Sequence, residues 1–464
     1  MAQTQKKQQD MGTGDVKKLL LQLMIPAVVA QVVNLLYNIV DRIYIGHIPG
    51  EGAMALTGVG VCMPLIMIVS AFAALVGNGG APRATIFMGR GDKESAEKTL
   101  GNCFSLQIAV SLVLTVILFV WNRDFLMAFG ASENTIEYGV SYMNIYAVGT
   151  IFVQLTLGMN MFITAQGFAQ TGMLSVLIGA AANIILDPIF IFALGMGVQG
   201  AALATIISQA MSCAWVLAFL FGRKTTLRLR ACNMKLRKNI ILPSLALGSS
   251  VFVMQSSESI LSVCFNSSLL RYGGDIAVGA MTILTSVMQF AMLPLQGLGQ
   301  GAQPIISYNY GAGNKDRVKS AYFLLLKISL SFSFLLWVSA MLFPHVFASL
   351  FTTDAALLDF TAHALRIYLA VMVLFGAQTA CQLTFTALGK AKQSIVVAVM
   401  RKFILLIPLI YIMPHIFTDD KTTAVYMAEP VADLLAVTFT VSLFSFEFRR
   451  TLRGMGAPAA GTQA

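Results

Sequence analysis

The stretches GNGGAPRATIFMGRGDK (residues 77–93) and GQGAQPIISYNYGAGNK (residues 299–315) align without gaps at an offset of 222 residues. The identical positions are Gly77/Gly299, Gly79/Gly301, Pro82/Pro304, Gly89/Gly311, Gly91/Gly313 and Lys93/Lys315. Earlier in each half, an offset of 217 residues pairs Pro26 with Pro243 and Asp41 with Glu258. Self-similarity at this distance indicates that the chain consists of two related halves.

The composition predicts that both halves lie in a membrane. Of the 464 residues, 57% are hydrophobic and 11% are charged, with a mean hydropathy of +0.76, which is atypical of a water-soluble domain. A membrane helix needs roughly 20 apolar residues, and no run shows the alternation of a membrane barrel. We therefore expect an all-α polytopic membrane protein with two pseudo-symmetric six-helix bundles. Its twelve transmembrane helices are predicted to start near residues 17, 54, 96, 137, 168, 199, 240, 277, 318, 360, 392 and 424.

The distribution of Lys and Arg predicts the orientation of the chain. Segments expected on the cytoplasmic side carry 25 of the 31 basic residues, and the group at 390–402, with Arg401 and Lys402, is counted among them. An even number of crossings then places both termini in the cytoplasm. The net charge of +10 follows from this topology; it favours anionic lipid headgroups as neighbours and gives no support for nucleic acid binding.

The same features predict the division of the chain. The predicted segments are a flexible cytoplasmic leader (1–15), an N-lobe (16–222), a basic cytoplasmic linker (223–238), a C-lobe (239–448) and a cytoplasmic tail (449–464). Two bundles that face one another leave a cleft at their interface, which is where we expect a substrate to bind.

The first predicted helix carries a polar stripe. Asp41 follows 22 uncharged residues, Leu19–Val40. The residues that share its side of the helix, within about 80°, are Gln31, Asn34 and Asn38. A charged side chain in hydrocarbon costs at least about 2.5 to 3.5 kcal/mol. We therefore expect the stripe to line a wet cavity or to meet other polar groups.

The fifth and sixth helices add further oxygen groups. In the segment NIILDP, Asn183 and Asp187 are four residues apart and share a face, and Pro188 then loosens the helix and frees carbonyl groups. Thr205 lies one turn beyond Ala201 in an apolar segment. Together with the first-helix acid, this set suits Na⁺ or a proton. In the alternative interpretation the two Asp residues are satisfied by amides or lie at the outer mouth, but intramembrane acids favour a functional role.

The second half has a comparable but weaker pattern. The polar residues on one side of the seventh helix are Gln255, Glu258, Ser259, Ser262 and Asn266. The tenth helix has no acid, only Gln378 and Gln382, for which hydrogen bonding between helices is an equally good explanation. Near the outer start of the last helix, Glu429 and Asp433 are predicted to be interface residues.

Motifs of enzymes are missing from the sequence. GMGVQG (195–200) matches a dinucleotide pattern but joins two membrane helices, so we interpret it as a tight turn. There is no GxxxxGK[ST], HExxH or GxSxG segment. We therefore expect no catalytic activity and no cofactor; any pumping would be driven by an ion gradient.

Several of these segments resemble one family, the multidrug and toxic compound extrusion (MATE) transporters, and its DinF/MepA-like bacterial branch in particular. The segments are NIVDRIYIGH (38–47), the repeated pair at 77–92 and 299–316, and TAQGFAQTGMLSVLIGAAANIILDPIFIF (164–192). The resemblance implies the MATE fold, two six-helix lobes in a V shape, and exchange of Na⁺ or H⁺ for cationic amphipathic drugs. It also implies a bacterial cytoplasmic (inner) membrane location.

The resemblance further implies roles for individual residues. The cation-coupling set is Asp41, Asp187, Asn183, Thr205 and the carbonyl of Ala201, and the first four would be metal ligands if the ion is Na⁺. Pro26 corresponds to a proline associated with a bend of the first helix. Glu258 matches a coupling acid of NorM-like members, whose tenth-helix Asp is absent here, so we place coupling in the N-lobe. The predicted substrate or cleft residues are Asn34, Asn38, Gln31, Gln255, Glu258, Ser262, Gln378 and Gln382.

The predicted function is therefore a cation-coupled antiporter, driven by Na⁺ or H⁺, that exports cationic drugs, dyes or toxic metabolites by alternating access. The Gly/Pro-rich segments 77–91 and 299–313 are predicted to be hinge loops on the cytoplasmic side. We expect a monomer whose partners are small cationic molecules and membrane lipids. The alternative is a flippase for lipid-linked precursors, but such a protein needs cationic cleft residues, whereas the predicted cleft carries acids.

Overall fold

The computed structural model describes residues 11–352 and 354–455, which excludes most of the predicted leader and part of the predicted tail. The described residues form helices and no strand. The first half contains α2 (Val16–Gly46), α3 (Gly52–Gly89), α4 (Lys93–Ala128), α5 (Ile136–Ala165), α6 (Ala169–Pro188), the π-helical η1 (Ile189–Ala193) and α7 (Gly197–Phe221). A short 3₁₀ turn, η2 (Ala231–Asn233), lies in the connection to the second half.

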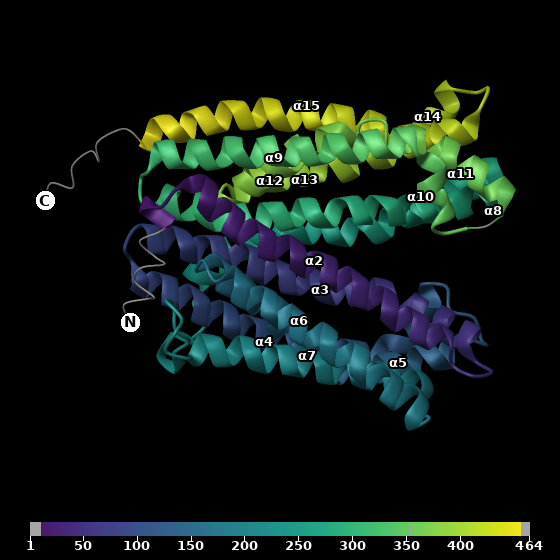
Figure 1. Cartoon of the computed structure of the whole chain (residues 1–464), viewed down its shortest axis with the longest axis horizontal. Coiled ribbons are helices and arrows are strands. Elements are labelled where there is room, and N and C mark those ends of the chain that lie inside the picture. The colour runs from purple at the N-terminus through teal and green to yellow at the C-terminus, as the bar shows by residue number, and fades with distance from the viewer. Residues whose placement is uncertain (1–10, 353, 456–464) are drawn as a thin grey trace, which may run out of the picture.

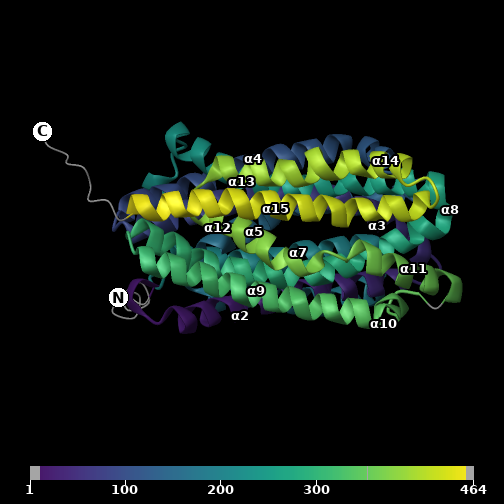
Figure 2. The ribbon, with the colours of Figure 1, turned by 90° about the horizontal axis from the view of Figure 1, so that it is seen from above.

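The second half starts with a very long helix. Its elements are α8 (Lys238–Gly311), α9 (Lys315–Leu342), α10 (Pro344–Ser349), α11 (Ala355–Tyr368), η3 (Met372–Leu374), α12 (Phe375–Ala387), α13 (Ala391–Val399), the π-helical η4 (Met400–Leu406), α14 (Ile407–Ile416) and α15 (Lys421–Met455). All long helices run roughly along the long axis of the molecule, and both ends of the described chain lie at the same end of it (Figures 1 and 2).

The twelve predicted spans are confirmed within the described residues. Ten helices are long and apolar enough to cross a membrane, and the pair Ala355–Tyr368 and Met372–Ala387, bent by 48°, makes an eleventh. Helix α8, counted once among the ten, contains two spans and so provides the twelfth, because its 74 residues would extend about 110 Å. Gly274, with φ of 65°, breaks it into two helices. Each predicted start lies within a few residues of an observed one.

The two halves pack together through glycines that occupy related positions in the repeat. A methyl group on Gly89 would overlap the carbonyl oxygen of Tyr308, and one on Gly311 would overlap the carbonyl oxygen of Ile86. Tyr308 and Ile86 are themselves 222 residues apart, so the contact has approximate two-fold symmetry. Because the backbones touch directly, only glycine fits at these two positions.

The prediction that 77–91 and 299–313 are hinge loops is wrong. Residues 77–89 form the end of α3 and residues 299–311 the end of α8, so all but the last residues of each segment are helical. Small residues in membrane helices permit close helix packing, and glycine and proline are tolerated there because neighbouring groups satisfy the backbone. The two segments therefore join the halves and do not form flexible connections.

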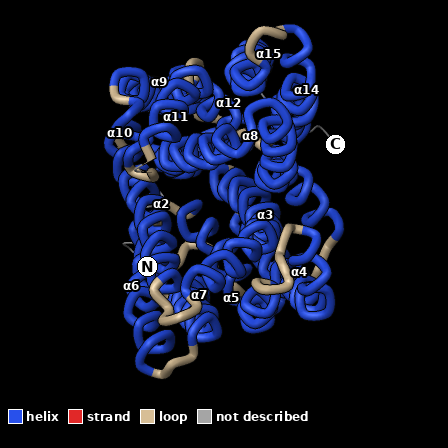
Figure 3. Tube along the Cα trace, turned by 90° about the vertical axis from the view of Figure 1, so that its right-hand side faces the viewer, coloured by secondary structure: helices blue, strands red, loops and turns tan. Residues whose placement is uncertain are grey.

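The halves meet at one end of the molecule and have separate cores at the other. Near the termini, one core combines Leu20 and Met24 of α2 with Ile305, Phe385 and other residues of the second half. Toward the opposite end, one core contains only residues of the first half, between Ile45 and Ala202, and another only residues of the second half, between Leu261 and Ala432. In Figure 1 the helices α2 to α7 accordingly diverge from α8 to α15 toward the end away from the termini, and Figure 3 shows the two groups from that end.

The first described residues are packed against the second half, although the sequence predicts a flexible leader. Met11 is 2% exposed. The side-chain amide of Asn309 and the guanidinium of Arg317 donate hydrogen bonds to its carbonyl oxygen, at 2.9 and 3.1 Å. The chain from Met11 onward is therefore held at the end where the halves meet.

Candidate functional site

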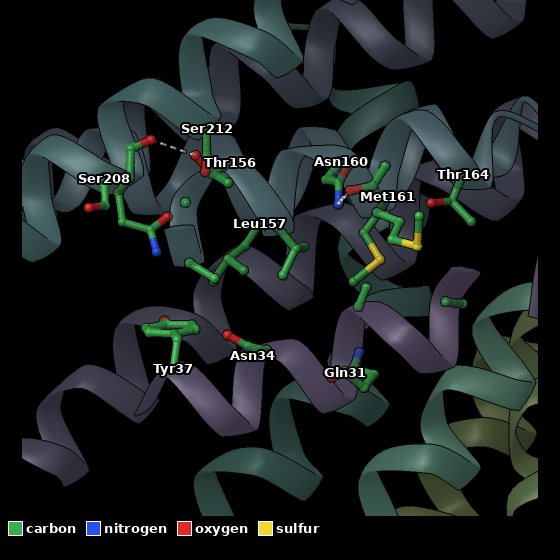
Figure 4. A pocket seen from close by; sticks show the side chains of 18 of the residues that line it. Gln31, Asn34, Tyr37, Thr156, Leu157, Asn160, Met161, Thr164, Ser208 and Ser212 are labelled. Atoms are coloured by element: carbon green, nitrogen blue, oxygen red, sulfur yellow. Dashed lines mark hydrogen bonds between the residues drawn. The ribbon is translucent and has the colours of Figure 1, made fainter. Parts of the chain in front are cut away.

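A pocket with a volume of about 120 Å³ lies inside the first half, beside the seam with the second. Its walls come from α2, α5, α6 and α7, and Figure 4 shows the side chains of α2 facing those of α5 and α7 across it. The polar residues in its lining are Gln31, Asn34, Tyr37, Thr156, Asn160, Thr164, Asn183, Thr205, Ser208, Gln209, Ser212 and Gln300. Apolar residues such as Leu157, Met161 and Met173 form the rest, so the pocket suits an amphipathic molecule.

One residue of the second half contributes to the wall of this pocket. The amide nitrogen of Gln31 in α2 donates a hydrogen bond of 3.2 Å to the amide oxygen of Gln300 in α8. Gln300 also lines the pocket. The pocket therefore changes when the two halves move relative to one another at this point.

Two carboxylates lie close together next to the pocket. Asp41 of α2 is 7% exposed and Asp187 of α6 is fully buried, and the two are near enough to share a hydrogen bond. The side-chain amide of Asn183 donates a hydrogen bond of 3.2 Å to Asp187. Asn183 itself lines the pocket, so the acid pair and the pocket share a wall.

Three buried oxygens at this acid pair have no hydrogen-bond donor: Oδ1 of Asp41, Oδ2 of Asp187 and Oδ1 of Asn183. Among the described residues, no Lys, Arg or His forms an ion pair with either acid. Buried acceptors of this kind need a partner, and two adjacent carboxylates favour a positively charged one. The atoms that could bind a cation here are hard oxygen ligands, which suit a proton or Na⁺.

The other predicted ligands, and the predicted cleft residue Asn38, have different surroundings. Thr205 is half-buried, lines the pocket and is within hydrogen-bonding reach of Tyr142. Ala201 is fully buried one turn earlier in α7. Asn38 is exposed, and its amide donates a hydrogen bond of 2.6 Å to the carbonyl oxygen of Asn34 in the same helix. In the described part of the chain, no group of three or more His, Cys, Asp or Glu is placed to hold a metal ion.

Two tyrosines at the site were not predicted. Tyr37 lines the pocket, and both Tyr37 and Tyr142 lie near enough to Asp41 for its charge to act on them. Tyr37 precedes Asp41 by four residues, so the helical spacing that identified the polar stripe also places this hydroxyl on the same side. No comparable signal exists for Tyr142, which reaches the site from another helix.

The second half has a buried charge cluster where the sequence predicts none. Arg401 and Lys402, expected in a cytoplasmic segment, lie in η4 within the span Ala391–Ile416, 9% and 5% exposed. The guanidinium of Arg401 pairs with Asp433 at 2.7 Å and with Glu429 at 3.5 Å. The predictions that these two bases are cytoplasmic and that Glu429 and Asp433 are interface residues are therefore wrong, because all four side chains are buried among the helices and both acids pair with Arg401.

Glu258, the counterpart of Asp41 in the repeat, belongs to this cluster. Its side chain is 56% exposed, and its carboxylate accepts an ion pair of 2.8 Å from Lys402. Arg401 also stacks on Phe375, with 5.0 Å between the guanidinium carbon and the ring centre. The predicted substrate counter-charge is thus already bound to a base of its own half.

The remaining predicted cleft residues of the second half differ in burial and in hydrogen bonding. Gln255 is half-buried with an unpaired side-chain oxygen, and Ser262 is exposed. Gln378 is 8% exposed and also has an unpaired oxygen. Gln382 donates hydrogen bonds to the hydroxyl and carbonyl of Ser394, at 2.9 and 3.1 Å, which joins α12 to α13. None of these four lines the pocket of the first half.

Pro26 lies inside α2 and is buried where this helix crosses the seam. A methyl group on Gly301 of α8 would overlap the backbone of Met24, and one on Gly297 would lie 2.8 Å from the Cα of Val28. The proline is thus placed between two points at which α2 touches the other half. A proline removes one helical hydrogen bond, so α2 can bend most easily next to this contact.

Comparison with known proteins agrees with a duplicated membrane fold. The model of the MatE family matches residues 26–189 and again residues 250–412, one match in each half. The chain belongs to this family and is a multi-pass membrane transporter.

Individual relatives match over nearly the whole chain. The multidrug export protein MepA of Staphylococcus haemolyticus is 24% identical over 428 residues, which is 92% of this chain and 93% of that protein. A crystal structure of a MATE protein in the bent conformation superimposes with a TM-score of 0.90 at 24% identity, over 97% of this chain and 99% of that one. A structure described as the straight conformation gives 0.88, also at 24% identity, over 96% and 98%.

Proposed function

We propose that this protein is a cation-coupled antiporter that exports cationic amphipathic molecules from bacterial cells. The observation that carries the proposal is the pair Asp41 and Asp187, which is buried, has no basic partner among the described residues and shares a wall with an amphipathic pocket. A coupling cation at the pair and a cationic substrate in the pocket would compete for the same negative charge. Binding of one therefore lowers the affinity for the other.

The proposed orientation places the end where the halves meet in the cytoplasm of a bacterial cell and the protein in the cytoplasmic (inner) membrane. The excess of Lys and Arg at this end supports that assignment. The halves then diverge toward the outside, as an exporter does when it releases substrate. Transport proceeds by separating the glycine contacts of α3 and α8 at one end while the halves approach at the other. We propose that a single chain carries out this cycle.

Charge also distinguishes the antiporter from the flippase alternative. A pyrophosphate substrate needs basic groups that are free to bind it, and the cluster of the second half contains two bases, Arg401 and Lys402. Each of them is already paired with acids of the same half. The unpaired charges that border the pocket are negative, which supports a cationic substrate.

Efflux of ethidium from drug-hypersensitive bacterial cells tests this function. Cells with the wild-type chain should export the dye, and Asp187→Asn should reduce the rate at least about tenfold, equivalent to about 1.4 kcal/mol of lost coupling. Asp124→Asn is the matched control, since Asp124 is an exposed acid of the same half. Equal export by wild type and Asp187→Asn at equal membrane levels would refute the proposed role of the acid pair. Vesicles with an imposed pH or Na⁺ gradient then identify the ion.

A further inference from the structure

A groove lined by basic residues runs from the seam between the halves to the outer face of α15. It consists of three neighbouring hollows. The first and second share Arg90 and Tyr310, and the second and third share Arg450. The first two have volumes of about 250 and 450 Å³. The groove lies at the end of the molecule that carries the termini, where α3 ends and α8 begins.

The groove collects positive charge from both halves. Its basic residues are Arg83, Arg90, Lys390, Arg449, Arg450 and Arg453. None of the described residues that line it is acidic. The acid Glu447 is 3.9 Å from Lys390 and 3.8 Å from Arg450, and Asp92 lies near enough to Arg90 for their charges to interact, so the six bases keep an excess of positive charge. Such an excess creates an attractive potential for an anion.

The inner part of the groove combines charge with apolar surface. The ring of Phe87 lies between two guanidinium groups, with 5.9 Å from its centre to Arg83 and 5.9 Å to Arg90. Ile86, Leu247 and Leu388 complete the lining. Nε of Arg83 is buried and has no hydrogen-bond acceptor. The backbone of Arg83 lies about 9 Å inside the end of α3, since this residue precedes Gly89 by six residues.

The outer part of the groove faces the surroundings of the protein. Phe446 of α15 is 67% exposed and lies beside Arg449, Arg450 and Arg453. The ring of Phe446 offers apolar surface to acyl chains, and the long side chains of the arginines beside it can reach the level of the lipid headgroups. The groove therefore leads from the lipid-facing surface of α15 to the seam.

We propose that this groove binds the phosphate headgroup of an anionic phospholipid of the cytoplasmic leaflet. The phosphate contacts Arg90 and Arg83 of α3 together with Lys390 and Arg450 of the second half, and the acyl chains follow the apolar face beside Phe446. Basic pockets between membrane helices on the cytoplasmic side take such headgroups. Since the groove is built from both halves, a bound lipid stabilises the state in which they touch at this end.

Native mass spectrometry of the full chain, purified in detergent, tests the site. Phosphatidylglycerol should bind more tightly than phosphatidylcholine. The variant Arg90→Gln/Arg450→Gln should weaken the tightest phosphatidylglycerol binding about 30-fold, because each basic residue contributes about 1 kcal/mol and about 1.4 kcal/mol is tenfold. Both residues are exposed, so this variant should fold. Arg83→Gln, which removes the buried donor, should act in the same direction.

The matched control is Arg223→Gln/Lys224→Gln, which removes two exposed charges of the linker at the same end of the molecule. It should retain wild-type binding. If control and groove variants lose affinity equally, the attraction is a general effect of surface charge and the site is refuted. Inorganic phosphate distinguishes the source of the anion: if phosphate alone protects the chain from thermal unfolding as strongly as phosphatidylglycerol, the lipid assignment is wrong.

Discussion

The two halves carry charged groups on corresponding pairs of helices, but the charges are balanced in only one of them. In the first half, α2 and α6 bring together Asp41 and Asp187, two acids. In the second half, the first part of α8 and η4 bring together Glu258 and Lys402, an acid and a base 2.8 Å apart. These are the first and fifth spans of each half. The repeat thus preserves the position of the site while its charge balance has changed.

The difference indicates which half exchanges a cation. An acid pair without a base is stable in a membrane protein only when a proton, a metal ion or a cationic ligand neutralises it. An acid that already holds a lysine does not need an external cation. The fifth span of each half is also interrupted by π-helical turns. These are η1, which follows Asp187, and η4, which contains Lys402. Such turns are frequent at functional sites.

The largest effect is expected from removing the central base of the second half. Arg401→Met leaves Glu429 and Asp433 buried without their partner, which should destabilise the protein by about 3 to 5 kcal/mol. The readout is the thermal unfolding temperature of the purified chain in detergent. Arg223→Met, at an exposed position, should unfold at the wild-type temperature. An unchanged temperature for Arg401→Met would show that the cluster is not a buried ion-pair network.

Replacing a buried Asp with Asn should change the stability of the protein in opposite directions in the two halves. Asp433→Asn weakens a charged hydrogen bond of 2.7 Å and should cost about 1.5 to 3 kcal/mol. Asp187→Asn removes an uncompensated negative charge and should raise the unfolding temperature in alkaline buffer without sodium. Addition of Na⁺ or acid should reduce that gain. If both variants were destabilised alike, the acid pair would have a partner within the protein.

A smaller effect is expected at the contact between the pocket and the second half. Gln300→Ala removes the hydrogen bond from Gln31, worth about 0.5 to 1.5 kcal/mol. Because this bond joins the two halves, its loss should favour their separation at the end with the termini. Distance measurements between spin labels on α3 and α9 should report a larger population of the separated state. The distances in Gln209→Ala, a change in the same pocket but within one half, should match wild type.

The smallest effect is expected from Glu258→Gln. The side chain of Glu258 is 56% exposed, and glutamine keeps an oxygen that can accept a hydrogen bond from the buried Lys402, so the change should affect transport less than any of the preceding ones. Ethidium export should stay within about twofold of wild type, an energy of roughly 0.4 kcal/mol. Export lost to the same degree as in Asp187→Asn would mean that the second half takes part in coupling.

The spans and the individual acids could be predicted because their signals lie within single helices, whereas the contact between Asp41 and Asp187 was implied by the family resemblance. Hydropathy identified each crossing, and the spacing of Asn183 and Asp187 placed them on one face. The cluster of Arg401 with Asp433 depends on a contact between residues 32 positions apart, which no pattern along one helix reveals. Counting bases by segment also grouped Arg401 with Lys390, although about 16 Å of helix separates them. The glycines of segments 77–91 and 299–313 led to a prediction of flexible loops, whereas in the structure they allow helices to pack closely.

The most direct test of the central claim is the number of cations displaced when ethidium binds to the purified protein. Proton release in unbuffered solution and displacement of radioactive sodium together cover both candidate ions. Wild type and Glu258→Gln should each release about one cation per bound dye, since the two ligands exclude one another at the acid pair. Asp187→Asn should release none. Release that persists in Asp187→Asn but disappears in Glu258→Gln would place the exchange in the second half and contradict this account.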